Sequence, residues 1–89
     1  MQLPQVRYFL AVCEELNFCR AARRCGVSQP SVSYAIGALE QNMGGALFLR
    51  KSSVALTELG RAIRPYLEEI ARNADRAFQA AQGLTLHAD

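Results

Sequence analysis

The sequence has few of the features that mark membrane, secreted or fibrous proteins. None of its apolar runs approaches the roughly 20 residues that a membrane-spanning helix needs. Three prolines and six glycines are too few for a collagen-like or disordered chain of 89 residues. The first residues, Met1 to Pro4, lack the basic stretch and apolar block of a signal peptide. We therefore expect a cytoplasmic protein that makes no membrane contact.

Cysteine and histidine are also scarce, and their spacing argues against metal binding and catalysis. Cys13, Cys19 and Cys25 recur every six residues, and an odd number of cysteines forms no complete disulfide framework. They lack the tight Cys-x2-Cys pair of zinc sites, and the only histidine, His87, lies far along the chain. A lone histidine is a poor start for nucleophilic catalysis. We expect reduced thiols that pack as small apolar side chains, with no cofactor in this chain, and a redox role as the alternative.

The composition is that of one small globular domain with an uneven distribution of charge. Hydrophobic residues make up 51% and charged residues 20%, and the formal net charge is +2. Residues 1–57 carry six lysines or arginines against three acidic residues, whereas residues 58–89 carry four against five. A basic face in the first two thirds of the chain would suit phosphate groups, and a simply solvated surface would have the same composition.

Hydrophobic spacing predicts a helix over residues 4–16 and a shorter helix over residues 19–25. The apolar positions of the first helix recur at intervals of three and four and are Val6, Phe9, Leu10, Cys13 and Leu16. Asn17 breaks this helix. Cys19 stands where a capping hydroxyl is usual at the start of the second, and Gly26 ends the second because glycine adopts the left-handed conformation freely.

Residues 29–43 are predicted to form a third helix with an uncharged outer face. Ser28 provides its N-cap, and Pro30 is tolerated in the first turn. One side of this helix holds the core positions Val32, Ile36, Leu39 and Met43. The other side holds Pro30, Tyr34, Gly37, Ala38 and Gln41, with Ser31 and Ser33 on the flanks. A solvated helix face usually carries Lys and Glu, so this face is suited to close approach to another surface.

A small hairpin is predicted after Gly44 and Gly45 end the third helix. Two short strands, residues 47–50 and 54–56, enclose the polar tip Lys51-Ser52-Ser53.

A long amphipathic helix is predicted over residues 58–83, capped by Thr57, bent at Pro65 and stopped at Gly83. Its apolar positions are Leu59, Ile63, Tyr66, Ile70, Ala74, Ala77 and Ala81. This stripe is longer than one small domain can cover, so we expect the same helix of a second copy to pack against it, antiparallel, in a homodimer. A solitary helix stabilised by its charges is the alternative.

The order of these elements is typical of a winged helix-turn-helix, a mainly α fold with three helices and a two-stranded wing, followed here by a long helix. The predicted DNA-binding domain covers residues 1–57, with the helix-turn-helix at about 18–37 and the wing at about 47–56. In this arrangement the second helix of the motif enters the DNA major groove. Residues 58–83 form the linker and dimerisation helix, and residues 84–89 a tail or the start of a hinge.

Several blocks of the sequence resemble the amino-terminal domain of LysR-type transcriptional regulators. They are Ser28-Gln29-Pro30-Ser31-Val32-Ser33, Leu47-Phe48-Leu49-Arg50 and Leu56-Thr57-Glu58-Leu59-Gly60, within a match over about residues 1–83. The resemblance implies sequence-specific binding of double-stranded promoter DNA, dimerisation through the long helix, and tetramers in the full-length protein. It also implies a carboxy-terminal effector domain, absent from these residues, that senses a small-molecule inducer.

The chain departs from the family pattern at several positions. Tyr34 stands where members often have Arg, and Gly37 and Ala38 stand where basic residues are common. The wing is one residue shorter than usual and lacks its second Arg, and Cys19 replaces the usual hydroxyl. These differences concern the DNA sequence preference and the affinity, and leave the expected fold unchanged.

The candidate DNA-binding residues lie at the start of the third helix and in the wing: Ser28, Gln29, Pro30, Ser31, Ser33, Tyr34, Arg50, Lys51 and Ser52. The Gln29 amide can pair with adenine in the major groove, and Pro30 can press on a thymine methyl group. Tyr34 either contacts the DNA backbone or covers an edge of the core. The basic wing suits the minor groove or the backbone, although Arg50 paired with an acidic residue is the alternative.

Three arginines of the second helix, Arg20, Arg23 and Arg24, are further candidates for contacts with the DNA backbone. Three rival functions stay open on the sequence alone. A winged helix can bind a protein instead of DNA, the cysteines can carry redox chemistry or catalysis, and a molybdate-type regulator has a related amino-terminal domain. A steep salt dependence of binding to duplex DNA separates the first rival from the main hypothesis.

Overall fold

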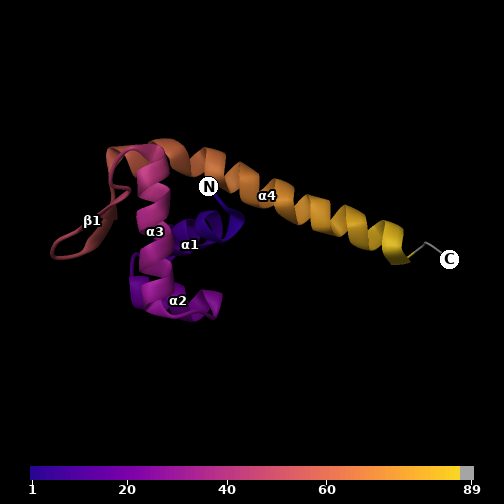
Figure 1. Cartoon of the computed structure of the whole chain (residues 1–89), viewed down its shortest axis with the longest axis horizontal. Coiled ribbons are helices and arrows are strands. Elements are labelled where there is room, and N and C mark those ends of the chain that lie inside the picture. Colours follow the sequence, from indigo (N-terminus) through magenta and orange to yellow (C-terminus); the bar gives the residue numbers. More distant parts are fainter. Residues whose placement is uncertain (87–89) are drawn as a thin grey trace.

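The computed structural model describes residues 1–86, and the described chain forms four helices and one two-stranded sheet (Figure 1). The elements are α1 (Leu3–Glu15), α2 (Phe18–Cys25), α3 (Gln29–Met43), β1 (Phe48–Arg50), β2 (Val54–Leu56) and α4 (Glu58–Leu86). The helices α1 to α3 and the hairpin gather at one end, and α4 projects from them (Figure 1). His87 and the rest of the predicted tail lie outside the described residues.

The turn between α1 and α2 differs from the prediction by one residue at each end. Leu16 takes a left-handed conformation with φ of 49° and donates its N–H to the Val12 carbonyl, so α1 ends at Glu15. The expected burial of Leu16 is wrong, because its side chain is 46% exposed.

Asn17 is the N-cap of α2, and this overturns the expected place of Cys19. Asn17 Oδ1 accepts the backbone N–H of Arg20 at 2.8 Å, so the helix begins at Phe18. Cys19 is an exposed residue inside the first turn and caps nothing. Asparagine can both break one helix and cap the next, and the prediction assigned Asn17 only the first of these roles.

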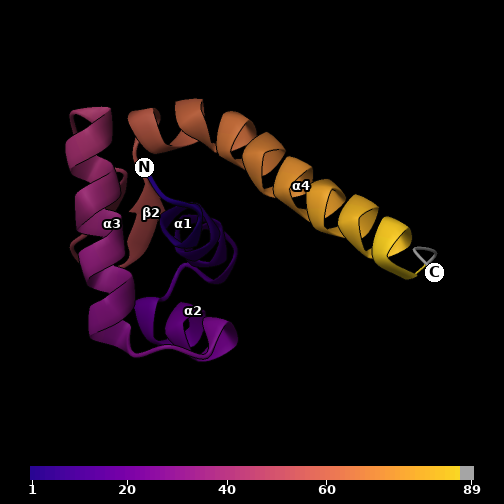
Figure 2. The ribbon, with the colours of Figure 1, turned by 45° about the vertical axis from the view of Figure 1, so that its right-hand side comes forward.

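The helix-turn-helix itself forms as predicted. Gly26, with φ of 71°, ends α2, and Ser28 caps α3 by accepting the Ser31 N–H at 3.2 Å. Gly44, with φ of 83°, ends α3. The two helices of the motif are therefore joined by three residues, and Figure 2 shows α2 beside the start of α3, at a steep angle to it.

The core lies between α1, α2, α3 and the hairpin. Its largest fully buried side chains are Phe9, Ile36, Leu39, Leu47, Val6, Val12 and Val32. Phe48 of β1 carries the hairpin into this core, because its ring lies 5.4 Å from that of Phe9 in α1 and 5.8 Å, edge-on, from that of Phe18 in α2. The strands pair antiparallel, with Phe48 opposite Leu56 and Arg50 opposite Val54. The mainly α winged helix-turn-helix expected from the sequence is confirmed.

The backbone of Leu47, just before β1, joins three elements. Its N–H donates to Glu40 Oε2 of α3 at 2.8 Å, and its carbonyl accepts the Thr57 N–H at 3.0 Å. Thr57 is the predicted cap of α4: its hydroxyl oxygen accepts the Gly60 N–H at 3.0 Å, and its O–H donates to the Ala46 carbonyl. The end of α3, the start of the hairpin and the start of α4 therefore meet at one residue.

The helix α4 continues past its predicted end. Gly83 does not stop it, since the helix runs to Leu86, and residues 84–86 are helical and not a tail. A single glycine costs only about 1 kcal/mol in a helix, which does not by itself end one. Pro65 lies inside the helix, and Figure 2 shows the first turns at an angle to the remainder, as expected where proline removes a backbone hydrogen bond.

The core covers only part of the predicted apolar stripe of α4. The face on the core is centred on Leu67, which is 2% exposed and was not among the predicted stripe residues, with Leu59 and Ile63 partly buried beside it. Tyr66 and Ile70 are left 68% and 38% exposed. Leu67 follows the helical spacing of Ile63, but the adjacent Tyr66 follows it equally well, so spacing did not separate them.

The close approach of α4 to Leu47 requires glycine at position 60. A Cβ atom there would collide with the Leu47 carbonyl and would lie 2.7 Å from Leu56 Cδ2. We expect Gly60→Ala to lower the free energy of unfolding by about 1–3 kcal/mol, as overpacked core positions do. Urea unfolding followed by circular dichroism at 222 nm measures the change.

Gly83→Ala is the matched control, because a Cβ atom at position 83 of the same helix meets nothing within 4 Å. This variant is expected to gain up to about 1 kcal/mol from helix propensity. Equal stability of the two variants would contradict the steric role of Gly60.

Candidate nucleic-acid interface

The exposed start of α3 gathers most of the predicted DNA-binding residues. Ser28, Gln29, Pro30 and Ser31 are all exposed, and Ser33 is half-buried. Tyr34 is 83% exposed, so it does not cover an edge of the core. The capping geometry of Ser28 accounts for this placement, because it turns the first residues of α3 outward at the end of the turn.

Short hydrogen bonds along α3 hold these polar side chains in place. Gln29 Nε2 donates to Ser33 Oγ at 2.9 Å, one turn further on, and the hydroxyls of Ser28 and Ser31 lie 2.8 Å apart. The bond to Ser33 uses one of the two Nε2 hydrogens, so the second hydrogen and Oε1 stay available among the described residues. One donor and one acceptor are what the major-groove edge of adenine requires.

Beyond Tyr34, the outward face of α3 is hollowed and carries few polar groups. A shallow hollow is lined by Tyr34, Gly37, Ala38 and Gln41. As the sequence predicted, no outward position of this stretch carries a charge. A face of this kind allows another surface to approach closely and requires few hydrogen bonds from it.

The wing presents one basic residue at its tip. Lys51, Ser52 and Ser53 are exposed in the loop that joins the strands, beside α3 (Figure 1). Leu49 on the outer side of β1 is 54% exposed and lies opposite Ala55. The tip is polar and accessible, as predicted.

Arg50 is engaged within the protein. Its Nη2 lies 3.6 Å from Glu40 Oε1, and its guanidinium carbon lies 4.5 Å from the centroid of the Phe18 ring. A guanidinium at that distance from an aromatic face is in cation–π contact. These contacts support the structural alternative for Arg50, and a direct contact with DNA stays a prediction.

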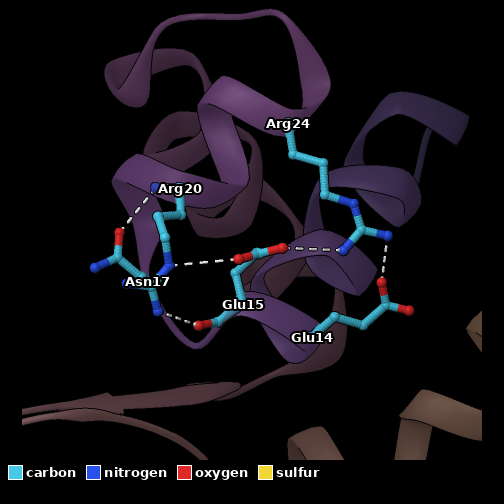
Figure 3. A network of polar contacts seen from close by, with 5 residues as sticks. All are labelled: Glu14, Glu15, Asn17, Arg20 and Arg24. Carbon is cyan, nitrogen blue, oxygen red and sulfur yellow. Dashed lines mark hydrogen bonds and ion pairs between the residues drawn. The ribbon is translucent and has the colours of Figure 1, made fainter.

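Two of the three α2 arginines are bound to the end of α1 (Figure 3). Arg20 Nε lies 3.4 Å from Glu15 Oε1, and Arg20 also donates to the Glu15 carbonyl. Arg24 pairs with Glu14 and, at 3.3 Å, with Glu15; the hydrogen bond and charge of Glu14 raise the pKa of Arg24. Arg23 is exposed as well, and it makes no ion pair with residues 1–86.

The cysteines lie in three different environments. Cys13 is buried, and burial raises the pKa of its thiol to about 12, so this thiol stays protonated near neutral pH. Cys25 is half-buried and Cys19 exposed. Within residues 1–86 no group of His, Cys, Asp or Glu is arranged to hold a metal ion. No helix in that range is long and apolar enough to cross a membrane.

Comparisons with known proteins identify the family to which this architecture belongs. The family model described as "Bacterial regulatory helix-turn-helix protein, lysR family" matches residues 3–61. The transcriptional regulator IlvR of Caulobacter vibrioides is 44% identical over 85 residues, covering 94% of this chain and 29% of IlvR. BudR of Klebsiella aerogenes is 41% identical over 85 residues, covering 94% of this chain and 59% of BudR. The chain thus spans less than two thirds of the length of these relatives.

Solved structures match nearly the whole chain, and several of them contain DNA. The CbnR DNA-binding domain in complex with DNA superposes with a TM-score of 0.85 at 32% identity, covering 96% of this chain and 99% of that one. The BenM DNA-binding domain with benA site 1 DNA gives 0.86 at 32% identity, with 96% and 97% covered. Full-length OxyR of Pseudomonas aeruginosa gives 0.88 at 37% identity over 93% of this chain and 28% of OxyR. This chain therefore belongs to the LysR family of bacterial regulatory proteins and forms its winged helix-turn-helix DNA-binding domain.

Proposed function

We propose that this domain binds promoter DNA as a homodimer, with α3 in the major groove and the wing on the minor groove or backbone. The observation that carries the proposal is the exposed, uncharged face of α3, which begins with the oriented Gln29 amide and ends in a shallow hollow. A helix face without charge is unusual on a solvated surface, and it fits a groove whose bases are read by hydrogen bonds and apolar contact. The DNA complexes among the similar structures add support.

The proposed contacts divide into those that read bases and those that bind phosphate. Gln29 and Pro30 face base edges from the first turn of α3, and Tyr34 reaches the backbone or the base next to it. Lys51 at the wing tip and Arg23 of α2 are the accessible cations that would bind phosphate. Phosphate contacts of this kind set the salt dependence of binding and carry little sequence information.

The exposed face of α4 is the proposed dimer surface. Tyr66, Ile70, Phe78 and Leu84 are large apolar side chains that the rest of the described chain leaves exposed. Ala77 and Ala81 are exposed as well and are small enough for two helices to approach closely. A second α4 packed antiparallel on this face would make a two-fold dimer and require two DNA half-sites related by the same symmetry. Of the predicted stripe, Leu59, Ile63 and Ala74 are already partly covered within the chain and would contribute less.

The wider role that we propose is that of a regulator of transcription that performs no catalysis. The curated relatives are transcriptional regulators, and this chain covers 29% of IlvR and 59% of BudR. Recognition of a small-molecule inducer, if the whole protein has one, would then fall to residues outside this chain. A protein-binding winged helix is the second candidate, and it would show no steep salt dependence of DNA affinity.

Selection from a random pool of duplex DNA tests the function directly. The folded chain is incubated with the pool at moderate salt, and the bound duplexes are amplified and sequenced. We expect enrichment of a two-fold symmetric motif whose half-sites are separated by whole helical turns. Absence of any enrichment with the folded protein would contradict DNA reading by this domain.

Gln29→Ala tests the proposed base contact. Loss of one bidentate amide–adenine pair should weaken binding to the selected site by about 1–3 kcal/mol and relax the preference at one base position. The affinity for unrelated DNA should stay the same, because phosphate contacts are untouched. Titration of each duplex by fluorescence anisotropy measures both effects, and unchanged discrimination between sites would remove Gln29 from base reading.

Tyr66→Glu tests the dimer surface. Tyr66 is 68% exposed, so the substitution leaves the core intact, while a carboxylate buried between two helices is strongly unfavourable. We expect the dimer dissociation constant from sedimentation equilibrium to rise at least about tenfold. Gln79→Glu, the same added charge at an exposed position on the polar face of α4, is the control and should change it little. Similar dissociation constants for both variants would contradict an interface on the Tyr66 face.

A further inference from the structure

Glu40, Arg50 and Phe18 connect the wing to both helices of the helix-turn-helix. Glu40, near the end of α3, uses both of its carboxylate oxygens: Oε2 accepts the Leu47 N–H at 2.8 Å, and Oε1 lies 3.6 Å from Arg50 Nη2. The Arg50 guanidinium also lies over the ring of Phe18, the first residue of α2. A single side chain of α3 therefore contacts the segment before β1 and the last residue of β1.

The surroundings of this pair favour a lasting contact. The side chain of Glu40 is 21% exposed and that of Arg50 is 41% exposed. Partial burial reduces the screening of the ion pair by water and salt, and the aromatic face gives the guanidinium a second favourable contact. For Arg50 to bind a phosphate, both contacts would have to be given up or shared.

Because Arg50 belongs to the last residue pair of the hairpin, its position determines where the wing tip lies. Arg50 pairs with Val54 as the last pair of the strands, so Lys51, Ser52 and Ser53 form the whole connecting loop. Lys51 follows Arg50 directly and is the other cation of residues 47–56. The place of the Lys51 ammonium group relative to α3 thus depends on where Glu40 holds Arg50.

We propose that Glu40 and Arg50 are positioning residues, which hold the wing beside α3 so that Lys51 reaches the DNA backbone. Arg50 acts through Glu40 and Phe18 and is not itself a phosphate ligand. This inference rests on the proposed function, since it assumes that α3 and the wing bind the same duplex.

Glu40→Gln separates positioning from direct contact, because the two roles predict opposite changes. Glutamine keeps an oxygen that accepts the Leu47 N–H but removes the charge that holds Arg50. If Arg50 positions the wing, affinity for the selected duplex falls by about two- to fivefold, as for the loss of one exposed ion pair. The slope of log K against log salt also falls by about 0.9 for each phosphate that the protein no longer binds. If Arg50 binds DNA, releasing it from Glu40 leaves the affinity unchanged or raises it.

A double-mutant cycle with Lys51→Gln supplies the readout that a merely structural role would not move. Lys51→Gln should lower the salt slope by itself, and Glu40→Gln should then have little further effect, because the phosphate contact that it positions is already absent. General destabilisation would instead weaken binding equally in both backgrounds. Melting temperatures of all four proteins, well above the temperature of the titration, ensure that folded proteins are compared.

Glu68→Gln is the matched control, because it removes the same charge from an ion pair with Arg64 on α4, outside the wing. It should leave the salt slope unchanged. Additive effects of Glu40→Gln and Lys51→Gln, or unchanged or tighter binding by Glu40→Gln, would overturn the inference. Failure of the unaltered chain to bind any selected duplex would instead contradict the proposed function, so the two failures are distinguishable.

Discussion

The two hydrogen bonds of the Leu47 backbone set the relation between the DNA-reading helix and everything that follows it. Leu47 lies in a fully buried position, where an unpaired N–H or carbonyl would cost about 1–3 kcal/mol, and both groups find partners: Glu40 of α3 and Thr57 before α4. Gly60 then brings the first turn of α4 against the same carbonyl. The wing and the long helix therefore share one anchor, which explains why Leu-Phe-Leu-Arg and Leu-Thr-Glu-Leu-Gly occur together in this chain.

Much of this fold was predictable because its determinants are local. Ser28, Gly26, Gly44 and Thr57 act on residues within one turn of themselves, and each behaves as its residue type indicates. The predictions were wrong where one residue had two possible local roles, or where contact with a distant residue determined the structure. Asn17 served as a cap and displaced Cys19 from that role, glycine at position 83 was too weak a signal to end a helix, and contact with the core, not spacing, separated Leu67 from Tyr66.

The features of the candidate site also fall into two groups, those set by nearby residues and those set by distant contacts. The exposed face of α3 follows from helical periodicity and a single cap, so its residues could be named from the sequence. The ion pairs could not, because Glu40 and Arg50 lie ten residues apart and Arg20 and Arg24 meet acidic residues of the preceding helix. Fewer cations of residues 1–57 are therefore available to phosphate than their number alone suggests. Four of its arginines, Arg7, Arg20, Arg24 and Arg50, are paired with acidic side chains, which leaves shape and the chemistry of α3 a larger share in recognition.

The contact between Arg7 of α1 and Asp75 of α4, at 3.1 Å, has a geometric consequence beyond its modest strength. Together with buried Leu67, it fixes the rotation of α4 about its own axis relative to α1. A helix turns by about 100° and rises about 1.5 Å per residue, so every side chain beyond Asp75 inherits its direction from this setting. The number of residues between Leu67 and Phe78 therefore sets the angle between these two side chains about the helix axis. Adding one residue there would swing the distal apolar surface by about a quarter of a turn while leaving each contact of α3 as it was.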